Sequence, residues 1–121
     1  MEPLRTAETN ETPKVNLDKA AGIFQIEGRS LTETPSEFYK PAIQWLKGYA
    51  KAPNPETTVT FNFEYLNIES SKSILDLLNI LEEIPGARVT WYFGAQAEDM
   101  EEIGEELAEL VNIPFSFQAK T

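Results

Sequence analysis

The sequence of 121 residues contains no cysteine and no histidine. Without cysteine, the chain can form no disulfide and has no thiolate for catalysis or metal binding. Without histidine, it lacks the commonest general base of enzymes and the commonest neutral ligand of metal ions. These absences exclude most hydrolytic sites, and we expect a protein that is not an enzyme and needs no cofactor or metal.

Long apolar runs, glycine-rich loops and positive charge are also scarce. No apolar run approaches the roughly 20 residues of a membrane-spanning helix, and no secretory leader opens the chain, so we expect a cytoplasmic protein. The six glycines are scattered and form no phosphate-binding motif, so a nucleotide-dependent enzyme is unsupported. Twenty acidic against ten basic residues give a net charge of −10. This charge repels nucleic acid and anionic membranes, and we expect neither a nucleic-acid partner nor membrane insertion.

The chain is long enough for one domain with a single core. Residues 1–12 are polar and lack apolar periodicity, so they are predicted to form a flexible tail, with the domain over residues 13–121. Residues 14–18 and 22–28 have the composition of two short strands. The loop between them ends at Gly22, which tolerates positive φ, so a hairpin is predicted.

Three helices are predicted from apolar side chains at helical spacing. The first begins at a capping box over Thr34–Glu37 and runs to about Lys51; Pro41 is expected either to kink it or to mark the start of its regular part. The second begins at Ser70 and ends before Pro85. The third carries five apolar side chains that are expected to face inward: Met100, Ile103, Leu107, Leu110 and Val111.

Three more strands follow from period-two alternation and turn signals. Residues 57–66 and 89–93 alternate between apolar and polar side chains. The last strand covers residues 113–119, and Pro114 places it at a sheet edge or at a strand start, because proline cannot donate to a central ladder. After the hairpin, helices alternate with strands, which predicts a single α/β domain with a mixed, mostly parallel sheet. Functional loops are expected at the carboxyl ends of the strands.

The predicted third helix has an acidic polar face without a lysine or arginine. Its acids are Glu98, Asp99, Glu101, Glu102, Glu105, Glu106 and Glu109. The simplest interpretation is a solvated face. A surface that attracts a basic partner is the main alternative, and a divalent-cation site is a third.

Aromatic side chains cluster in the two strands at 57–66 and 89–93. They are Phe61, Phe63, Tyr65, Trp91, Tyr92 and Phe93. Alternation predicts that most of these rings lie in the core and that Tyr92 points to the opposite face of the sheet. The negative net charge disfavours a stacking platform for nucleic-acid bases.

The junction between the strand at 57–66 and the next helix contains two adjacent serines, Ser70 and Ser71. A serine in the first turn of a helix can accept from free backbone amides, and its replacement by alanine costs on the order of 1 kcal/mol. A phosphate there would add nearly two negative charges at the positive end of the helix dipole. The junction is therefore compatible with a structural cap and with a phosphorylation site.

Several segments together resemble the SiaC family of bacterial regulatory phosphoproteins. They are YLNIESSKSILDLLNILEE from Tyr65 to Glu83, WYF at residues 91–93, the acidic last helix, and the terminal NIPFSFQ. The resemblance covers Thr12 to Ala119. It implies a fold similar to the STAS domain of anti-sigma factor antagonists, which agrees with the α/β order, and it implies a non-enzymatic signalling switch.

The family resemblance also implies protein partners. The acceptor in the family is a threonine directly after the asparagine of a YLN or YFN motif, modified by a SiaB-type kinase and cleared by a SiaA-type metal-dependent phosphatase. The unmodified form binds and promotes a SiaD-type diguanylate cyclase, which makes cyclic di-GMP and favours biofilm formation. Binding and modification share one surface, which in this sequence comprises Tyr65, Leu66, Asn67, Ile68, Glu69 and Lys72.

The position after Asn67 is Ile68, which has no hydroxyl, and Glu69 follows where the family has serine. Three hypotheses are open. The acceptor is shifted to Ser70 or Ser71, or Glu69 holds the protein in a state resembling the phosphorylated one, or phosphorylation is lost and only partner binding remains. The alternative function is a small-ligand-binding STAS-like module that uses the same strand-end crevice.

Overall fold

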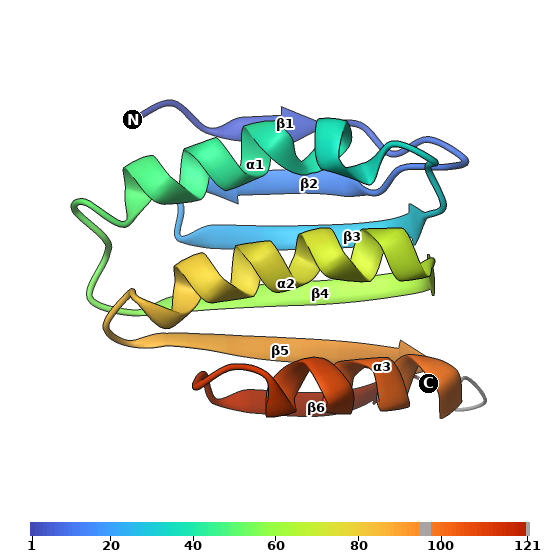
Figure 1. The fold of residues 1–121 in the computed structure, drawn as a ribbon. Coiled ribbons are helices and arrows are strands. Elements are labelled where there is room, and N and C mark those ends of the chain that lie inside the picture. Colours follow the sequence, from blue (N-terminus) through green and yellow to red (C-terminus); the bar gives the residue numbers. More distant parts are fainter. Residues whose placement is uncertain (95–97, 121) are drawn as a thin grey trace.

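Figure 1 shows the computed structural model of the chain, which describes residues 1–94 and 98–120. The strands are β1 (Leu4–Thr6), β2 (Lys14–Asp18), β3 (Ile23–Ser30), β4 (Thr57–Leu66), β5 (Ala87–Gly94) and β6 (Phe115–Lys120). The helices are α1 (Pro35–Tyr49), α2 (Ile68–Glu82) and α3 (Glu98–Glu109). The predicted order of a hairpin followed by alternating helices and strands is confirmed. No helix in the described part of the chain is long and apolar enough to cross a membrane.

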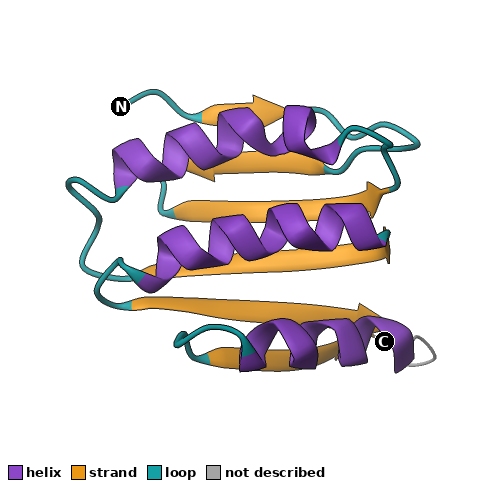
Figure 2. Cartoon of the chain, in the orientation of Figure 1, coloured by secondary structure: helices purple, strands orange, loops and turns teal. Residues whose placement is uncertain are grey.

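The strands form one sheet in chain order, from β1 at one edge to β6 at the other. The pairs β1–β2 and β2–β3 are antiparallel, and the three remaining pairs are parallel. Each parallel crossover steps to the next strand in the same direction, so right-handed connections place all three helices on the same face of the sheet. Figure 2 shows this arrangement, with the helices in one layer and the strands in the other.

The predicted flexible tail over residues 1–12 is wrong in part, because it contributes strand β1. This strand pairs with β2. Arg5 Nη2 lies 2.8 Å from Asp18 Oδ2, and Trp45 Nε1 donates to the carbonyl oxygen of Glu2 at 2.8 Å. A three-residue strand is too short to show periodicity, so only its pairing with β2 reveals it. The sheet therefore begins before residue 13.

The core lies between the helices and the inner face of the sheet. The buried side chains of the two central strands are Val59, Phe61, Phe63, Val89 and Trp91. Their positions confirm the alternation predicted for β4 and β5. On the outer face Tyr92 stands beside Asn62, so its predicted orientation is also confirmed.

Helix α1 begins at Pro35 as predicted, but the predicted capping box does not form. Thr34 is the N-cap residue and makes no side-chain cap hydrogen bond. Its hydroxyl instead lies 3.3 Å from that of Thr32, which also accepts from the Thr34 backbone N–H. The helix continues through Pro41 to Tyr49, so its regular part does not start at Pro41.

Helix α3 packs on β5 through Trp91. The indole is fully buried, and its Nε1 donates to the carbonyl oxygen of Met100 at 2.9 Å. Gly104 lies against the same ring, and a Cβ added there would stand 2.5 Å from Trp91 Nε1. This approach of helix to sheet therefore requires glycine at position 104.

Candidate functional site

The strand–helix junction lies at the carboxyl end of β4, where α2 begins (Figure 1). Helix α2 begins at Ile68 rather than Ser70, and its N-cap is Asn67. Asn67 Oδ1 accepts from the backbone N–H of Ser70 at 2.8 Å, and the Asn67 carbonyl accepts from that of Ser71 at 3.1 Å. The prediction that a serine caps this helix is therefore wrong. Asparagine caps as well as serine does, and it precedes both serines in the chain.

Asn67 also connects the junction to the end of β3. Its backbone N–H donates to the carbonyl oxygen of Ser30 at 3.0 Å, and its Nδ2 donates to that of Thr32 at 3.1 Å. Its backbone and both ends of its side-chain amide are thus engaged. These bonds hold the start of α2 at a defined position relative to the neighbouring strand.

Ser70 is completely buried in a chain of hydroxyl groups. Its Oγ accepts from Ser30 Oγ at 2.7 Å and donates to the Ser30 carbonyl oxygen at 3.3 Å. Because Ser30 gives its one hydroxyl hydrogen to Ser70, the Tyr39 hydroxyl is the donor in the 2.7 Å contact between Tyr39 and Ser30. Burial raises the pKa of Tyr39, with a smaller opposing effect of the Ser30 hydrogen bond, so the phenol keeps its proton. Ser70 therefore ties α2 to α1 and β3.

Ser71 differs from its neighbour in exposure and in its hydrogen bond. It is partly exposed, and its Oγ donates back to the carbonyl oxygen of Ile68 at 2.7 Å. Of the two phosphoacceptor candidates, only Ser71 has surface that another protein can reach.

The exposed residues of the junction include two large apolar side chains. Ile68 is 75% exposed and Tyr65 is 56% exposed. Glu69 and Lys72 are exposed as well. An apolar surface flanked by charges is typical of a protein-binding site.

Tyr65 departs from the core position that alternation predicts for it. Gly28 stands opposite Phe63, whereas Arg29 stands opposite Tyr65, so the register shifts at this point. One extra residue in a strand reverses which side chains face the core beyond it. The guanidinium of Arg29 lies 5.5 Å from the centre of the Tyr65 ring and pairs with Glu64 at 3.0 Å. The bulge thus turns an aromatic ring toward the surface.

A groove of about 410 Å³ runs between the first turns of α2 and the face of α3. Its lining residues are Leu66, Asn67, Ile68, Ser71, Lys72, Leu75, Ile103, Glu106, Leu107 and Leu110. Five of the candidate residues of the junction are thus brought together, whereas Tyr65, Glu69 and Ser70 lie outside the groove.

The α3 wall of the groove contains apolar residues that the helical spacing predicted to face inward. Met100 and Leu107 are buried as predicted, but Leu110 is 64% exposed. The reason is that α3 ends at Glu109, so Leu110 lies beyond the part of the helix that packs on the sheet. The one sequence signal that Leu110 lies on the same side as Ile103 is the spacing of seven residues between them.

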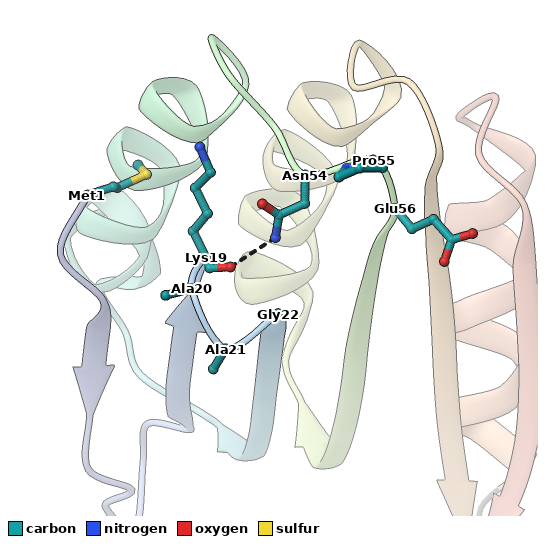
Figure 3. Close-up of a pocket in the computed structure, with 8 residues that line it drawn as sticks. All are labelled: Met1, Lys19, Ala20, Ala21, Gly22, Asn54, Pro55 and Glu56. Atoms are coloured by element: carbon teal, nitrogen blue, oxygen red, sulfur yellow. Dashed lines mark hydrogen bonds between the residues drawn. The ribbon is translucent and has the colours of Figure 1, made fainter.

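A larger hollow, of about 850 Å³, lies at the opposite end of the sheet, beside the β2–β3 hairpin (Figure 3). Asn54 Nδ2 donates to the carbonyl oxygen of Lys19 at 2.9 Å, and Lys19 Nζ donates to that of Ala52 at 2.5 Å. Its most prominent polar side chains are therefore already used to join the hairpin to the α1–β4 loop. Gly22, on its wall, has φ +69, as the hairpin prediction requires.

The acidic face of α3 was one candidate for a divalent-cation site. Among residues 1–94 and 98–120, no group of three or more acidic side chains is placed to hold a metal ion. The exposed acids are instead available to solvent or to a basic partner.

The two-layer fold with an exposed apolar groove at the carboxyl ends of its parallel strands is that of a small α/β binding protein. A family model described as "SiaC family regulatory phosphoprotein" matches residues 6–120. The chain belongs to this family.

Individual relatives agree with the family assignment. An uncharacterized protein of Pseudomonas aeruginosa strain UCBPP-PA14 is 29% identical in an alignment of 123 positions that covers 98% of each chain. The solved structure of SiaC of Pseudomonas aeruginosa has a TM-score of 0.89 at 27% identity, covering 99% of this chain and all of that one. A complex of the diguanylate cyclase SiaD with its activator SiaC, from the same organism, contains a chain with a TM-score of 0.88 at 28% identity, covering 97% of this chain and 99% of that one.

Proposed function

We propose that this chain is a non-enzymatic bacterial regulator that binds and activates a diguanylate cyclase through its junction surface, which we define as residues 65–72. Its family consists of regulatory phosphoproteins, and the related SiaC is the activator in a complex with the cyclase SiaD. Such a regulator would work in the cytoplasm, the location that the sequence analysis predicts.

The observation that carries this proposal is the exposure of Ile68. The side chain is large, apolar and 75% exposed at the start of α2, where hydrogen bonds through Asn67 hold the backbone in place. An apolar side chain presented on a rigid element is a typical anchor for a partner protein. Ile68 also occupies the position of the acceptor threonine that the family resemblance implies. The proposed cyclase-binding surface therefore coincides with the position at which the family is modified.

The proposal is tested by adding the purified chain to a diguanylate cyclase from the same genome and measuring cyclic di-GMP synthesis from GTP. We expect the cyclase rate to rise with the concentration of the chain and then to saturate, and we expect the chain alone to make no product. A cyclase rate that does not respond, together with no binding in calorimetry, would contradict the proposal.

We further propose that phosphorylation regulates this surface and that Ser71 is the acceptor for a SiaB-type kinase, with a SiaA-type phosphatase reversing the modification. Ser70 is buried and hydrogen-bonded, whereas Ser71 is partly exposed on the wall of the groove. A phosphate on Ser71 would break its bond to the Ile68 carbonyl and add charge beside Glu69 and the apolar groove. It would therefore weaken binding of the cyclase.

This regulation is tested by mass spectrometry after incubation with a SiaB-type kinase from the same genome. We expect labelling of the natural chain, loss of labelling in Ser71→Ala, and no change in Ser36→Ala, which alters an exposed serine outside the surface. Ile68→Thr restores the family's acceptor residue and is expected to gain a second labelled position. Absence of label on the natural chain would contradict the Ser71 proposal and favour lost phosphorylation.

A further inference from the structure

We propose that this protein associates with a second copy of itself through the open edge of β6. The two β6 strands pair antiparallel and join the two sheets into one. This contact goes beyond the proposed function, because β6 is an edge strand and contributes no residue to the junction surface (Figure 1).

The two edges of the sheet differ in how well they are protected against pairing with another molecule. Strand β1 is three residues long, follows Pro3 and packs against α1. Strand β6 is six residues long and carries no charged side chain before Lys120. Proteins protect sheet edges by shortening the edge strand, by covering it, or by placing proline or charged side chains along it. The β6 edge lacks these protections over most of its length.

The backbone groups of β6 alternate in direction. Val89 stands opposite Phe115, and its N–H donates to the carbonyl oxygen of Pro114 at 2.9 Å. In a parallel ladder this pattern repeats every two residues. The β6 residues that turn their N–H and C=O groups toward β5 are therefore Ser116, Gln118 and Lys120. Those whose N–H and C=O groups point away from the sheet are Phe115, Phe117 and Ala119.

A second β6 strand satisfies the outward groups when the pair is centred on Phe117. Phe117 then faces Phe117 of the other copy, and Phe115 faces Ala119. Residues that face each other as a hydrogen-bonded antiparallel pair exchange both N–H···O bonds, so every outward group finds a partner. Pro114 removes no bond from this contact, because its nitrogen belongs to the set that points toward β5.

The side chains on the inner face fit the same register. Phe115 and Phe117 are half-buried, and their ring centres lie 5.8 Å apart. Pairing places one aromatic ring against another at the centre and the large Phe115 against the small Ala119 on either side. Aromatic cross-strand pairs stabilise a sheet. The contact would therefore cover rings that the single chain leaves partly exposed.

The outer face of the strand is also compatible with self-pairing. The exposed Ser116 faces the exposed Gln118 of the other copy, which brings a hydroxyl to a side-chain amide. Lys120 faces Pro114, and its Nζ donates within its own chain to Asn62 Oδ1 at 2.7 Å. No two like charges are therefore placed opposite each other along the strand.

The charge of the whole chain opposes the contact. Each copy carries a net charge of −10. Added salt screens this repulsion and leaves the backbone bonds and the aromatic contacts in place. We therefore expect self-association to strengthen as the salt concentration rises, which is the opposite of the behaviour of a contact made by ion pairs.

The contact leaves both junction surfaces accessible. Strands β4, β5 and β6 run parallel to one another. Antiparallel pairing of the two β6 strands therefore places the carboxyl ends of these strands at opposite ends of the joined sheet. If the proposed function holds, one dimer carries two cyclase molecules.

The experiment is sedimentation equilibrium of the full chain over a concentration series at low and high salt. We expect the mean mass to rise from that of one chain toward that of two, and to do so at lower concentration in high salt. In NMR, amide exchange of Phe117 and Ala119 should slow as the chain is concentrated, whereas that of Gln118, which bonds to β5, should not change. A chain that keeps the mass of a monomer at every concentration and salt would overturn the proposal.

Variants at exposed positions test the edge and the register. Ala119→Pro removes an outward N–H without affecting the ladder to β5, and we expect it to weaken self-association about tenfold. Combining Ser116→Lys with Gln118→Glu places opposite charges face to face and should strengthen self-association about fivefold. Combining Ser116→Lys with Gln118→Lys places like charges face to face and should weaken it, although this double variant lowers the net negative charge. Urea denaturation confirms that each variant is folded.

The outcomes of these variants are distinct. A dimer that Ala119→Pro does not weaken, or that both double variants change equally, has its contact elsewhere, and the proposal is then wrong. A monomeric chain that loses cyclase binding on Ala119→Pro would assign the β6 edge to a strand of the cyclase and would also overturn the proposal. None of these results bears on whether the natural chain activates a cyclase, which is measured separately.

Discussion

The two ends of the sheet present two hollows of different character. The hairpin end has the larger one, about 850 Å³, but Lys19 and Asn54 there already bond to backbone carbonyls. The carboxyl end has a groove of about 410 Å³ whose walls include the exposed side chains Ile68 and Leu110. Volume alone would select the hairpin end, whereas the proposed binding surface lies at the carboxyl end, because binding depends on groups that the fold has not already used.

The largest expected effect tests this contrast directly. Ile68→Arg places a charge in the apolar groove, and we expect it to weaken cyclase binding at least a hundredfold, about 2.7 kcal/mol, as loss of an interface anchor does. The matched change at the hairpin end is Ala21→Arg, also at an exposed position, which should leave binding within twofold. Calorimetry of both variants decides the matter. Equal losses of cyclase affinity, or a greater loss for Ala21→Arg, would contradict the proposal that the cyclase binds at the carboxyl end.

The next effect concerns the core contact that positions the α3 wall. Gly104→Ala inserts a Cβ against the buried Trp91 indole, and we expect the free energy of unfolding to fall by about 2 kcal/mol. Gly48→Ala is the control, because the nearest atom to its added Cβ is the flexible end of Met1 at 3.3 Å. There the gain in helix propensity should raise stability by up to about 1 kcal/mol. Urea denaturation of both variants measures the difference, and an equally stable Gly104→Ala would show that α3 shifts easily.

The third effect concerns the rigidity of the carboxyl end. Asn67→Ala removes the cap of α2 and the bond to the Thr32 carbonyl, and we expect a loss of about 1.5 kcal/mol in the free energy of unfolding. Asn79→Ala changes an exposed asparagine within the same helix and should be neutral or slightly stabilising. If thermal unfolding shows the same change for both variants, Asn67 is not the anchor of the junction.

The smallest effect distinguishes the adjacent serines. Ser70→Ala leaves the Ser30 hydroxyl without its acceptor in a buried site, and we expect a loss of about 1 kcal/mol in stability. Ser71→Ala removes only a partly exposed bond to the Ile68 carbonyl and should cost less than about 0.5 kcal/mol. Chemical denaturation of the two variants is the measurement. A reversed order would mean that Ser71, rather than Ser70, is the structural serine.

Sequence patterns predicted the elements of regular structure well. The alternation around Phe61 and Trp91 and the helical spacing after Ser70 depend only on which side chains share a face, so both were readable. The junction was also located correctly. The roles within it were not, because Asn67, Ser70 and Ser71 all have side chains that can cap a helix, and neighbouring strands determine which one does.

Other features depended on contacts between distant parts of the chain. Strand β1 exists because β2 provides a pairing partner, and Tyr65 is exposed because the register shifts between β3 and β4. The exposure of Leu110 follows from the point at which α3 ends. None of these three features can be recognised from the residues next to it in the sequence.

The sequence by itself determined the α/β class, the order of elements, the location of the strand–helix junction and the acidic character of the last helix, since these follow from local periodicity and composition. Only the tertiary structure decided that Ser70 is buried, that Asn67 is the anchor, and that α2 and α3 form a groove. Each of these depends on residues far apart in the chain, such as Ser30 and Ser70 or Thr32 and Asn67. Such residues meet only when the sheet has brought its strands into register.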